Sequence, residues 1–312
     1  MRHRFFRATL AVLTAATAAL LTAAPAVARP EPHVVAREPI DDRASRIDVY
    51  SPSMDRVIST RVLHAAAGPA PTLYLLTGIG GGLDGVSWWH DTDVRAFFAD
   101  KQVDVVLPFG GAYSMYTDWR ADDPALGRNR WQTFLTAELP AALAGELDST
   151  GRAAVAGVSM SAGSALDLAI QAPGRYAAVA AYSGCPWSAD PSGVVGITAQ
   201  VTRGGGNPAN MWGPLGGPGW QAHDAYTFAS ALRGTAVYLS AATGVPGPID
   251  RGGAAIPPVE ALARTCTASF ARRLAALGIP ATHVDRPQGA HTWGQFETDL
   301  HDSWPLLAAA LE

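Results

Sequence analysis

The chain has 312 residues, 48% of them hydrophobic and 16% charged, and its 23 Lys and Arg against 27 Asp and Glu leave a formal net charge of −4. That length and apolar share suffice for one large domain with a well-buried core. An acidic chain without runs of basic residues is a poor candidate for nucleic-acid binding, so we expect no nucleic-acid partner.

The first 28 residues have the pattern of a cleaved signal peptide. Three arginines stand among the first seven residues, an apolar stretch follows over residues 8–24, and Ala26–Ala28 supplies small residues for cleavage. A membrane anchor is the alternative, but the stretch lacks a basic stop-transfer flank, and no later segment has the ~20 continuous apolar residues of a membrane span. We therefore expect a secreted or cell-envelope protein without a stable membrane span, with residues 29–312 as a single domain.

The chain contains two cysteines, Cys185 and Cys266. In an exported protein, two cysteines more often pair than stay free. We therefore expect a Cys185–Cys266 disulfide, with two buried thiols as the alternative.

Strand-like and helix-like stretches alternate along the chain, which is typical of an α/β domain with a mainly parallel central sheet. Between residues 184 and 225 the chain is rich in Gly, Pro, Asn and Trp without clear periodicity, and we expect this irregular segment to cover or border a cleft. The apolar runs that predict buried strands are Thr72–Leu76, Val103–Pro108, Ala153–Ala156, Ala177–Ala181 and Ala236–Leu239. The expected helices are Trp131–Glu146, Ser161–Gln171, Pro258–Leu277 and Thr298–Leu311.

The stretch GVSMSAGSA, residues 157–165, resembles the G-x-S-x-G elbow that presents a nucleophilic serine, with Ser161 in place of the second glycine. Ser159 falls at the predicted turn from strand to helix, where its hydroxyl would stand at the carboxyl edge of the sheet. Ser161 and Ser164 would lie within the helix. Ser159 is therefore the nucleophile candidate, although such a turn can also be purely structural.

A nucleophilic serine needs a base, and His291 is the best placed of the eight histidines. It follows a strand-like run over Thr282–Asp285 and precedes the last predicted helix, as the base does in the hydrolase order Ser, acid, His. A histidine that only caps the helix is the alternative. Because no H-E-x-x-H motif or clustered Cys/His spacing is present, we expect no metal.

The acid of such a triad is expected in the loop after the strand that precedes the base. Asp250 lies in the loop that follows the predicted strand Ala236–Leu239, and we choose it as the acid. Glu260 lies farther along, on a predicted helix, and Asp285 is too close in sequence to His291.

Two backbone N–H groups are candidates for an oxyanion hole. One belongs to Met160, directly after the nucleophile, and the other to the glycine-rich stretch over residues 77–82. Gly80, Gly82 and Gly85 also have the G-x-G-x-x-G spacing of a dinucleotide site. That alternative is disfavoured because Trp88-Trp89 follows instead of a clear helix, and we expect no cofactor.

Read together, these stretches resemble the antigen 85 family of mycolyltransferases, α/β-hydrolase-fold enzymes of mycolic-acid-bearing bacteria. The resemblance implies an α/β-hydrolase fold, with a mainly parallel sheet and helices on both faces. The matching stretches occur in the family's order over most of residues 29–312: LYLLTG at 73–78, YTDW at 116–119, WQTFLTAELP at 131–140, GVSMSAGSA at 157–165, NMWGP at 210–214, GGAAIP at 252–257 and HTW at 291–293.

Under this resemblance Ser159 matches the family's nucleophile and His291 its base. Asp250 matches the position of its acid, which is usually glutamate. Ile79 and Met160 match the oxyanion-hole donors.

The resemblance also places a substrate site, to which we assign Thr77, Gly80, Trp119 and Trp293. Thr77 and Gly80 replace the aspartate and arginine of the family's trehalose site, which puts trehalose specificity in doubt. Asp84, Trp88 and Trp89 are either an alternative sugar platform or, for the tryptophans, core residues.

The expected function is acyl transfer through a Ser159 acyl-enzyme. The resemblance implies trehalose mycolates or other acylated sugars as donors, and a second such molecule or arabinogalactan as acceptor. A secreted carboxylesterase with the same triad is one alternative, and a non-catalytic cell-wall or matrix-binding homologue is another. A sugar-binding module built on Trp88, Trp89 and Trp119 is the third.

Overall fold

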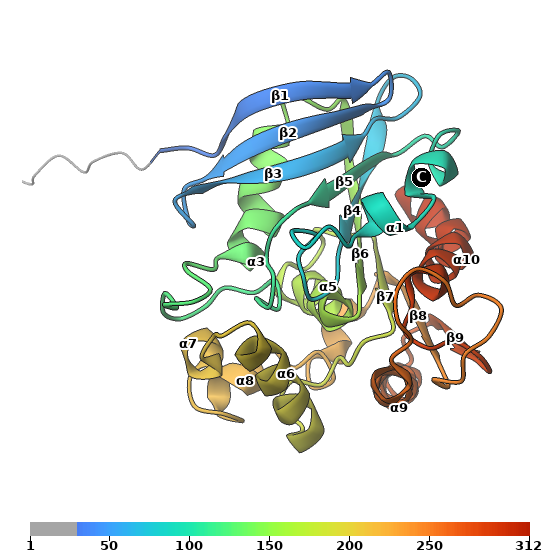
Figure 1. Cartoon of the computed structure of the whole chain (residues 1–312). Coiled ribbons are helices and arrows are strands. Elements are labelled where there is room, and N and C mark those ends of the chain that lie inside the picture. The colour runs from blue at the N-terminus through green and yellow to red at the C-terminus, as the bar shows by residue number, and fades with distance from the viewer. Residues whose placement is uncertain (1–29) are drawn as a thin grey trace, which may run out of the picture. The chain divides into compact units, whose positions relative to one another are not determined.

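A nine-stranded sheet organises the computed structural model, which describes residues 30–312. The expected signal peptide lies outside the described residues. The strands stand in the order β1-β2-β3-β5-β4-β6-β7-β8-β9 (Figure 1), with bounds β1 His33–Asp41, β2 Ala44–Ser51, β3 Arg56–Leu63, β4 Ala70–Leu76, β5 Asp104–Pro108, β6 Ser149–Val158, β7 Ala178–Tyr182, β8 Ala236–Ala242 and β9 Ala281–Arg286.

The sheet is parallel from β5 to β9, and β1–β3 extend it as an antiparallel meander. The five predicted strands are confirmed, each within a few residues. β2 and β3 were missed because strands with one face toward the core alternate polar and apolar residues rather than forming an apolar run. β1 was missed because it is mostly exposed and carries no buried run.

Helices cover both faces of the parallel strands, as the resemblance implied. The helices are α1 Trp88–Asp91, α2 Val94–Phe97, α3 Trp131–Thr133, a π-helical turn Phe134–Glu138, α4 Leu139–Leu143, α5 Met160–Gln171, α6 Pro191–Arg203, α7 Pro208–Trp212, α8 Pro218–Ala222, a 3₁₀ turn Ala229–Leu232, α9 Pro257–Ala276 and α10 Trp293–Leu311.

Two hydrophobic cores lie on opposite faces of the sheet. In one core, α10 and Trp88 of α1 pack against strand residues such as Leu73 and Ala154. In the other core, α5 and α9 pack against the neighbouring strand residues, such as Tyr74 and Val155.

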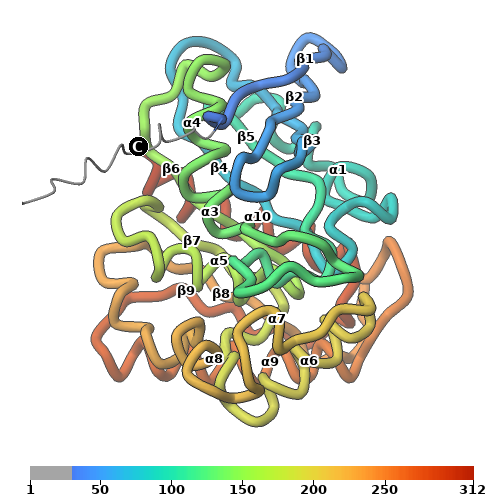
Figure 2. Tube along the Cα trace, turned by 90° about the vertical axis from the view of Figure 1, so that its left-hand side faces the viewer, coloured from blue at the N-terminus to red at the C-terminus, as the bar shows by residue number. Residues whose placement is uncertain are grey.

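The segment expected to be irregular contains α6, α7 and α8, which group together on one side of the sheet (Figures 1 and 2). Each begins with a proline, and the Asp190 and Asn207 side chains cap α6 and α7. These caps are helix-start signals that the low periodicity of the segment concealed. The segment does border a cavity, as expected.

Cys185 and Cys266 form a disulfide, with their Cα atoms 5.0 Å apart. The predicted pairing is therefore confirmed, and it joins the loop after β7 to α9. Within residues 30–312, no helix combines the length and apolar character needed to cross a bilayer.

Candidate active site

Ser159 stands alone between the end of β6 and the start of α5, at the predicted strand-to-helix turn. Its φ of 55° is a conformation that non-glycine residues rarely adopt. Two glycines allow the backbone to pack closely enough for this turn. A Cβ at Gly157 would lie 2.1 Å from the Ser161 carbonyl oxygen, and a Cβ at Gly184 would lie 2.5 Å from the Ser159 carbonyl oxygen. The structure thus has the sharp geometry of a nucleophile elbow.

The two neighbouring serines are bonded inside the fold. Ser161 Oγ accepts the Val158 N–H at 2.8 Å and lies near the Leu76 and Val158 carbonyl oxygens. Ser164 Oγ donates to the Met115 carbonyl at 2.7 Å. Both side chains are buried, whereas Ser159 is half-buried and its hydroxyl meets a histidine.

His291 Nε2 lies 2.9 Å from Ser159 Oγ, although the two residues are 132 positions apart in the sequence. The loop between β9 and α10 carries the histidine, which has a φ of 65°. Its backbone N–H donates to Gln295 Oε1, and its ring meets Phe296 edge-on at 5.0 Å. These contacts hold the imidazole in the position that a general base requires.

Glu260 is the carboxylate that contacts His291, with Oε2 2.7 Å from Nδ1. Its side chain is fully buried, and Oε1 accepts hydrogen bonds from the Ala242 N–H at 2.6 Å, Gln295 Nε2 at 2.7 Å and Ser183 Oγ at 2.9 Å. A carboxylate only accepts, so Nδ1 carries the proton and Nε2 is left to accept from Ser159.

The prediction of Asp250 as the acid is wrong. Its Oδ1 accepts from the Ala290 N–H at 2.9 Å and Thr292 Oγ1 at 2.8 Å, and its Oδ2 accepts from the Gly247 N–H at 2.7 Å. Asp250 therefore ties its own loop to the residues on either side of His291. The carboxylate beside His291 comes instead from the first turn of α9, which directs Glu260 into the interior. The family's preference for glutamate was the available signal.

The glycine-rich stretch after β4 lies beside the nucleophile, because a Cβ at Gly78 would be 3.8 Å from Ser159 Cβ. Hydrogen bonds from the Tyr113 N–H to the Ile79 carbonyl and from the Gly110 N–H to the Gly81 carbonyl hold this stretch in place. Met160 is the first residue of α5, so its N–H has no partner within the helix. Ile79 and Met160 remain the candidate donors of an oxyanion hole.

The residues assigned to the substrate site differ in their surroundings. Thr77 is buried, and its Oγ1 has no hydrogen-bond partner. Gly80 lies under the carboxylate of Asp84, which would be 1.9 Å from a Cβ at that glycine. Trp293 is mostly buried and packs edge-on against Trp88.

Trp119 does not face a substrate site, which corrects its assignment. Its ring is buried in the core, and Nε1 donates to the Ser114 carbonyl at 2.9 Å. Trp88 is equally buried and donates to the Leu76 carbonyl. Only Trp89 of the three tryptophans is partly exposed, and Arg95 stacks on it, so these residues form no joint sugar platform.

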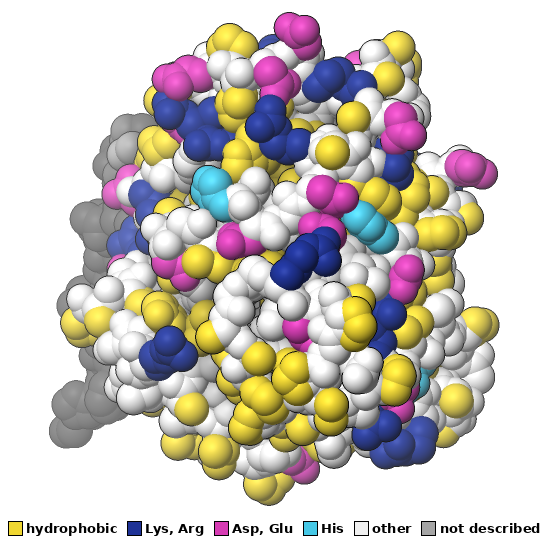
Figure 3. Space-filling model, turned by 45° about the vertical axis from the view of Figure 1, so that its right-hand side comes forward, with side chains coloured by type: hydrophobic (Ala, Val, Ile, Leu, Met, Phe, Trp, Pro, Cys, Tyr) yellow, Lys and Arg dark blue, Asp and Glu magenta, His cyan; other side chains and the backbone are white. Residues whose placement is uncertain are grey.

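A cavity of about 270 Å³ opens at Ser159 between α6 and α9. Its lining is mostly apolar, and exposed Val195, Val259 and Leu262 lie on the same two helices. Hydrophobic side chains also gather low on the face drawn in Figure 3, at the height of α6 and α9. The hydroxyl of Ser159 thus borders a space suited to an aliphatic group.

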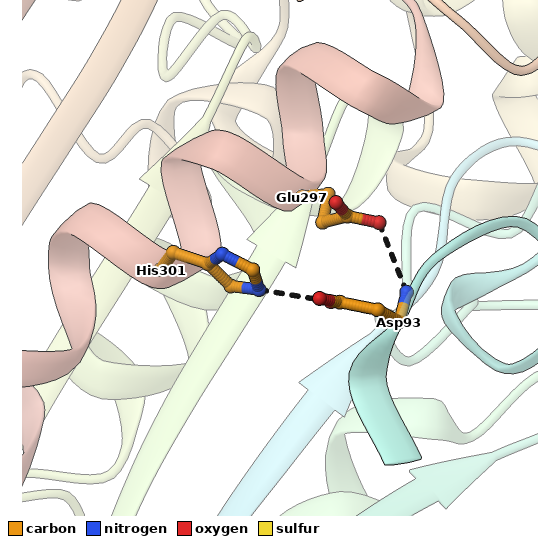
Figure 4. A group of neighbouring side chains, drawn as sticks. All are labelled: Asp93, Glu297 and His301. Carbon is orange, nitrogen blue, oxygen red and sulfur yellow. Dashed lines mark hydrogen bonds and ion pairs between the residues drawn. The ribbon is translucent and has the colours of Figure 1, made fainter. Parts of the chain in front are cut away.

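A second polar group lies on the other side of the sheet, where Asp93, Glu297 and His301 offer ligand atoms within 4.8 Å of one another (Figure 4). His301 Nε2 and Asp93 Oδ1 are 2.9 Å apart, and Glu297 accepts the Asp93 N–H and pairs with Arg251. These contacts join α10 to the loop before α2 and to the loop of Asp250. The position of these three side chains is therefore explained by their structural role in joining these segments.

The strand order, the elbow after β6 and the histidine loop before the last helix define an α/β-hydrolase-fold protein. Residues 51–307 match the model of a family described as putative esterase. The diacylglycerol acyltransferase/mycolyltransferase Ag85A of Mycobacterium tuberculosis is 34% identical over 281 residues, which cover 85% of this chain and 80% of that protein. Its counterpart in Mycobacterium leprae is 34% identical over 84% of this chain and 81% of the relative.

Solved structures agree with these sequence relationships. Mycobacterium tuberculosis MPT51 (FbpC1) superposes with a TM-score of 0.72 at 30% identity, covering 84% of this chain and 96% of that one. An S-formylglutathione hydrolase from Agrobacterium tumefaciens, at 15% identity and a TM-score of 0.66, covers 90% of this chain and all of its own, and shows the shared fold. The chain belongs to the putative-esterase family and, within it, to the antigen 85 mycolyltransferases.

Proposed function

We propose that this protein is an exported serine acyltransferase that moves a long-chain acyl group between sugar esters through a Ser159 acyl-enzyme. The observation that carries the proposal is the continuous hydrogen-bonded chain from Ser159 through His291 to the buried Glu260. The family relationship and the apolar cavity beside Ser159 support it.

In the first half of the reaction, His291 Nε2 takes the proton of Ser159 Oγ as the oxygen attacks an ester carbonyl. The Ile79 and Met160 N–H groups would stabilise the oxyanion, each donor contributing about 3 kcal/mol in comparable enzymes. Protonated His291 then returns its proton to the departing sugar oxygen, which leaves the acyl group on Ser159. Glu260 stabilises the imidazolium and holds the ring in the orientation that directs Nε2 at Ser159.

In the second half, a sugar hydroxyl attacks the acyl-enzyme while His291 accepts its proton. The bond between the acyl carbon and Ser159 Oγ then breaks, and His291 returns the proton to Ser159 Oγ, which releases the new ester and restores the free serine. The proposed donors and acceptors are trehalose mycolates or other acylated sugars, with arabinogalactan as a further acceptor. Transfer requires that the acceptor occupy the place from which water would otherwise attack. No step calls for a metal or another cofactor. The signal-peptide pattern of residues 1–28 supports a place in the cell envelope or outside it.

Hydrolysis is the second candidate, since Thr77 and Gly80, the positions assigned to the sugar, carry no long polar side chain. Thr77 is buried and Gly80 has no side chain, so a sugar would find fewer partners than in relatives with aspartate and arginine there. With a poorly held acceptor, water would take the acyl group from the same Ser159 intermediate.

The decisive experiment is covalent labelling with a long-chain alkyl p-nitrophenyl phosphonate, from which Ser159 Oγ would displace p-nitrophenolate, read by intact mass. We expect one adduct on the wild type and none on Ser159→Ala. Ser192→Ala is the matched control, because Ser192 lines the same cavity but its hydroxyl bonds to Asp190, and it should label like the wild type. A folded wild type that forms no adduct would favour the non-catalytic binding protein.

Transfer and hydrolysis are then separated by adding trehalose to a reaction with a medium-chain acyl ester. Acyl-trehalose formation that depends on Ser159 supports the transferase. Release of free acid alone, at a rate that trehalose does not change, supports the esterase.

A further inference from the structure

One face of α6 forms a wall of the cavity at Ser159. In an α-helix successive residues are turned by about 100°. The cavity-lining positions of α6 therefore form one continuous stripe, and Gly196 stands near its centre. These positions are Ser192, Gly193, Gly196, Ile197, Ala199 and Gln200.

The two glycines of this stripe have different surroundings. A Cβ at Gly193 would lie 1.9 Å from the Trp187 carbonyl oxygen, so close packing excludes any side chain there. A Cβ at Gly196 would have no atom within 4 Å. Glycine in a helix interior is less stable than alanine, and the packing of the protein supplies no reason for glycine at 196. An open position at the centre of a cavity wall indicates space for a ligand.

The opposite wall belongs to α9. Val259, Leu262 and Ala263 have the spacing of one helix face and line the cavity, while Glu260 on the adjoining face reaches His291. The space between the helices is therefore continuous with Ser159 and bounded by apolar atoms on the α9 side. Such surroundings suit a polymethylene chain better than a sugar, whose hydroxyl groups would lose hydrogen bonds with water against the α9 side.

A small cavity with polar residues in its lining adjoins the cavity at Ser159. Met115, Cys185 and Ile197 line both cavities, and the small one contains the hydrogen-bonded pair Asp167 and His223. Asp167 and His223 make that neighbouring space unfavourable for an aliphatic chain. The space between α6 and α9 is therefore the more apolar path from Ser159.

We infer that Gly196 determines acyl-chain specificity: its missing side chain leaves the groove through which the acyl chain of the ester passes between α6 and α9. This inference rests on the proposed Ser159 chemistry, because the groove begins at that hydroxyl. A side chain at position 196 would occupy the space of the chain beyond its first carbons and leave the ester carbonyl at Ser159 unobstructed.

The test compares p-nitrophenyl octanoate with p-nitrophenyl acetate as substrates of the wild type, Gly196→Ala, Gly196→Leu and Thr202→Leu. For Gly196→Leu we expect kcat/KM on octanoate to fall about tenfold or more, as overpacking a filled site does, with little change on acetate. Gly196→Ala should fold more stably and show a smaller fall in the same direction. Thr202→Leu adds the same side chain to an exposed position of α6 outside the cavity lining and should behave like the wild type.

A binding measurement separates this inference from the proposed function. In a Ser159→Ala background, Gly196→Leu should weaken the affinity for a fluorescent long-chain fatty acid, whether or not the wild type turns over esters. An inactive wild type with this Gly196-dependent binding would refute the proposed function and retain the inference. An unchanged octanoate-to-acetate ratio in both folded Gly196 variants, or an equal loss on both esters, would overturn the inference.

Discussion

Glu260 lies in the first turn of α9, and its hydrogen-bond partners come from four other parts of the chain. They are Ser183 after β7, Ala242 at the end of β8, His291 and Gln295 of α10. A buried carboxylate is stable only when such partners replace its lost hydration. The same bonds fix the direction of Oε2, so the structural role of Glu260 and its proposed catalytic role require the same position of the side chain.

Glu260→Gln should lower kcat on any ester substrate by roughly 10³- to 10⁴-fold, because a neutral amide neither stabilises the imidazolium nor enforces the required tautomer. Steady-state kinetics on a short-chain ester measures the effect. Asp250→Asn is the matched control, since its side-chain oxygen can still accept from Ala290 and Thr292, and it should retain most activity. The reverse ranking of the two variants would return Asp250 to the role of acid.

At the scale of elements, α9 combines the acid with an apolar wall of the cavity. Two sets of bonds hold the part of α9 between residues 260 and 266 in place: the Glu260 hydrogen bonds and the Cys185–Cys266 disulfide. Cys185 follows Gly184, whose backbone packs against the carbonyl oxygen of Ser159. The disulfide therefore links the elbow region directly to the helix that carries the acid.

Replacing both cysteines by serine should lower the free energy of unfolding by about 4 kcal/mol, because the bond closes a long loop in the unfolded chain. The sequence separation that sets the loop length is 81 residues. Urea unfolding of the oxidised protein and the double variant measures the difference. The double variant should remain active at low urea concentration, because the Glu260 hydrogen bonds do not involve sulfur. A double variant as stable as the wild type would argue against a stabilising role of the disulfide.

At the scale of the whole molecule, a buried contact between an aspartate and an arginine couples the last helix to the edge of the sheet. Asp299 of α10 is fully buried, and its Oδ1 accepts from Arg286 Nε at 2.8 Å, at the end of β9. Burial raises the pKa of Asp299 from 3.8 to about 7, and nearby Glu260 adds to that rise, while Arg286 opposes it. Because the raised pKa favours the protonated native state, this group's contribution to stability is complete below its ordinary pKa and is lost as the pH rises to about 7.

We therefore expect the Asp299 contribution to make the free energy of unfolding decline between about pH 4 and pH 7. In Asp299→Asn this part of the decline should be absent, because the amide does not titrate. Urea unfolding across that pH range measures the slope. Asp122→Asn, which alters an exposed aspartate paired with Arg128, should keep the wild-type slope. If Asp299→Asn also keeps it, the group does not titrate in this range.

Local sequence was sufficient for those features that neighbouring residues create. The strand–serine–helix turn at Ser159, the histidine before the last helix and the glycine-rich stretch near Ile79 all depend on short segments, and each lies where it was expected. The buried strands were equally predictable, because strands covered on both faces are apolar throughout.

Only the tertiary structure decided which of two acidic residues contacts His291 and which tryptophans are buried. Asp250 and Glu260 lie ten positions apart, and the choice depends on how their loop folds back and where α9 begins. Trp119, which the sequence assigned to a sugar site, is buried in the core. Sequence alone determined the fold class and the candidates for nucleophile and base, since these rest on local geometry. The partner of the base, the walls of the cavity and the open position at Gly196 are set by contacts between segments distant in the chain, which no local pattern encodes.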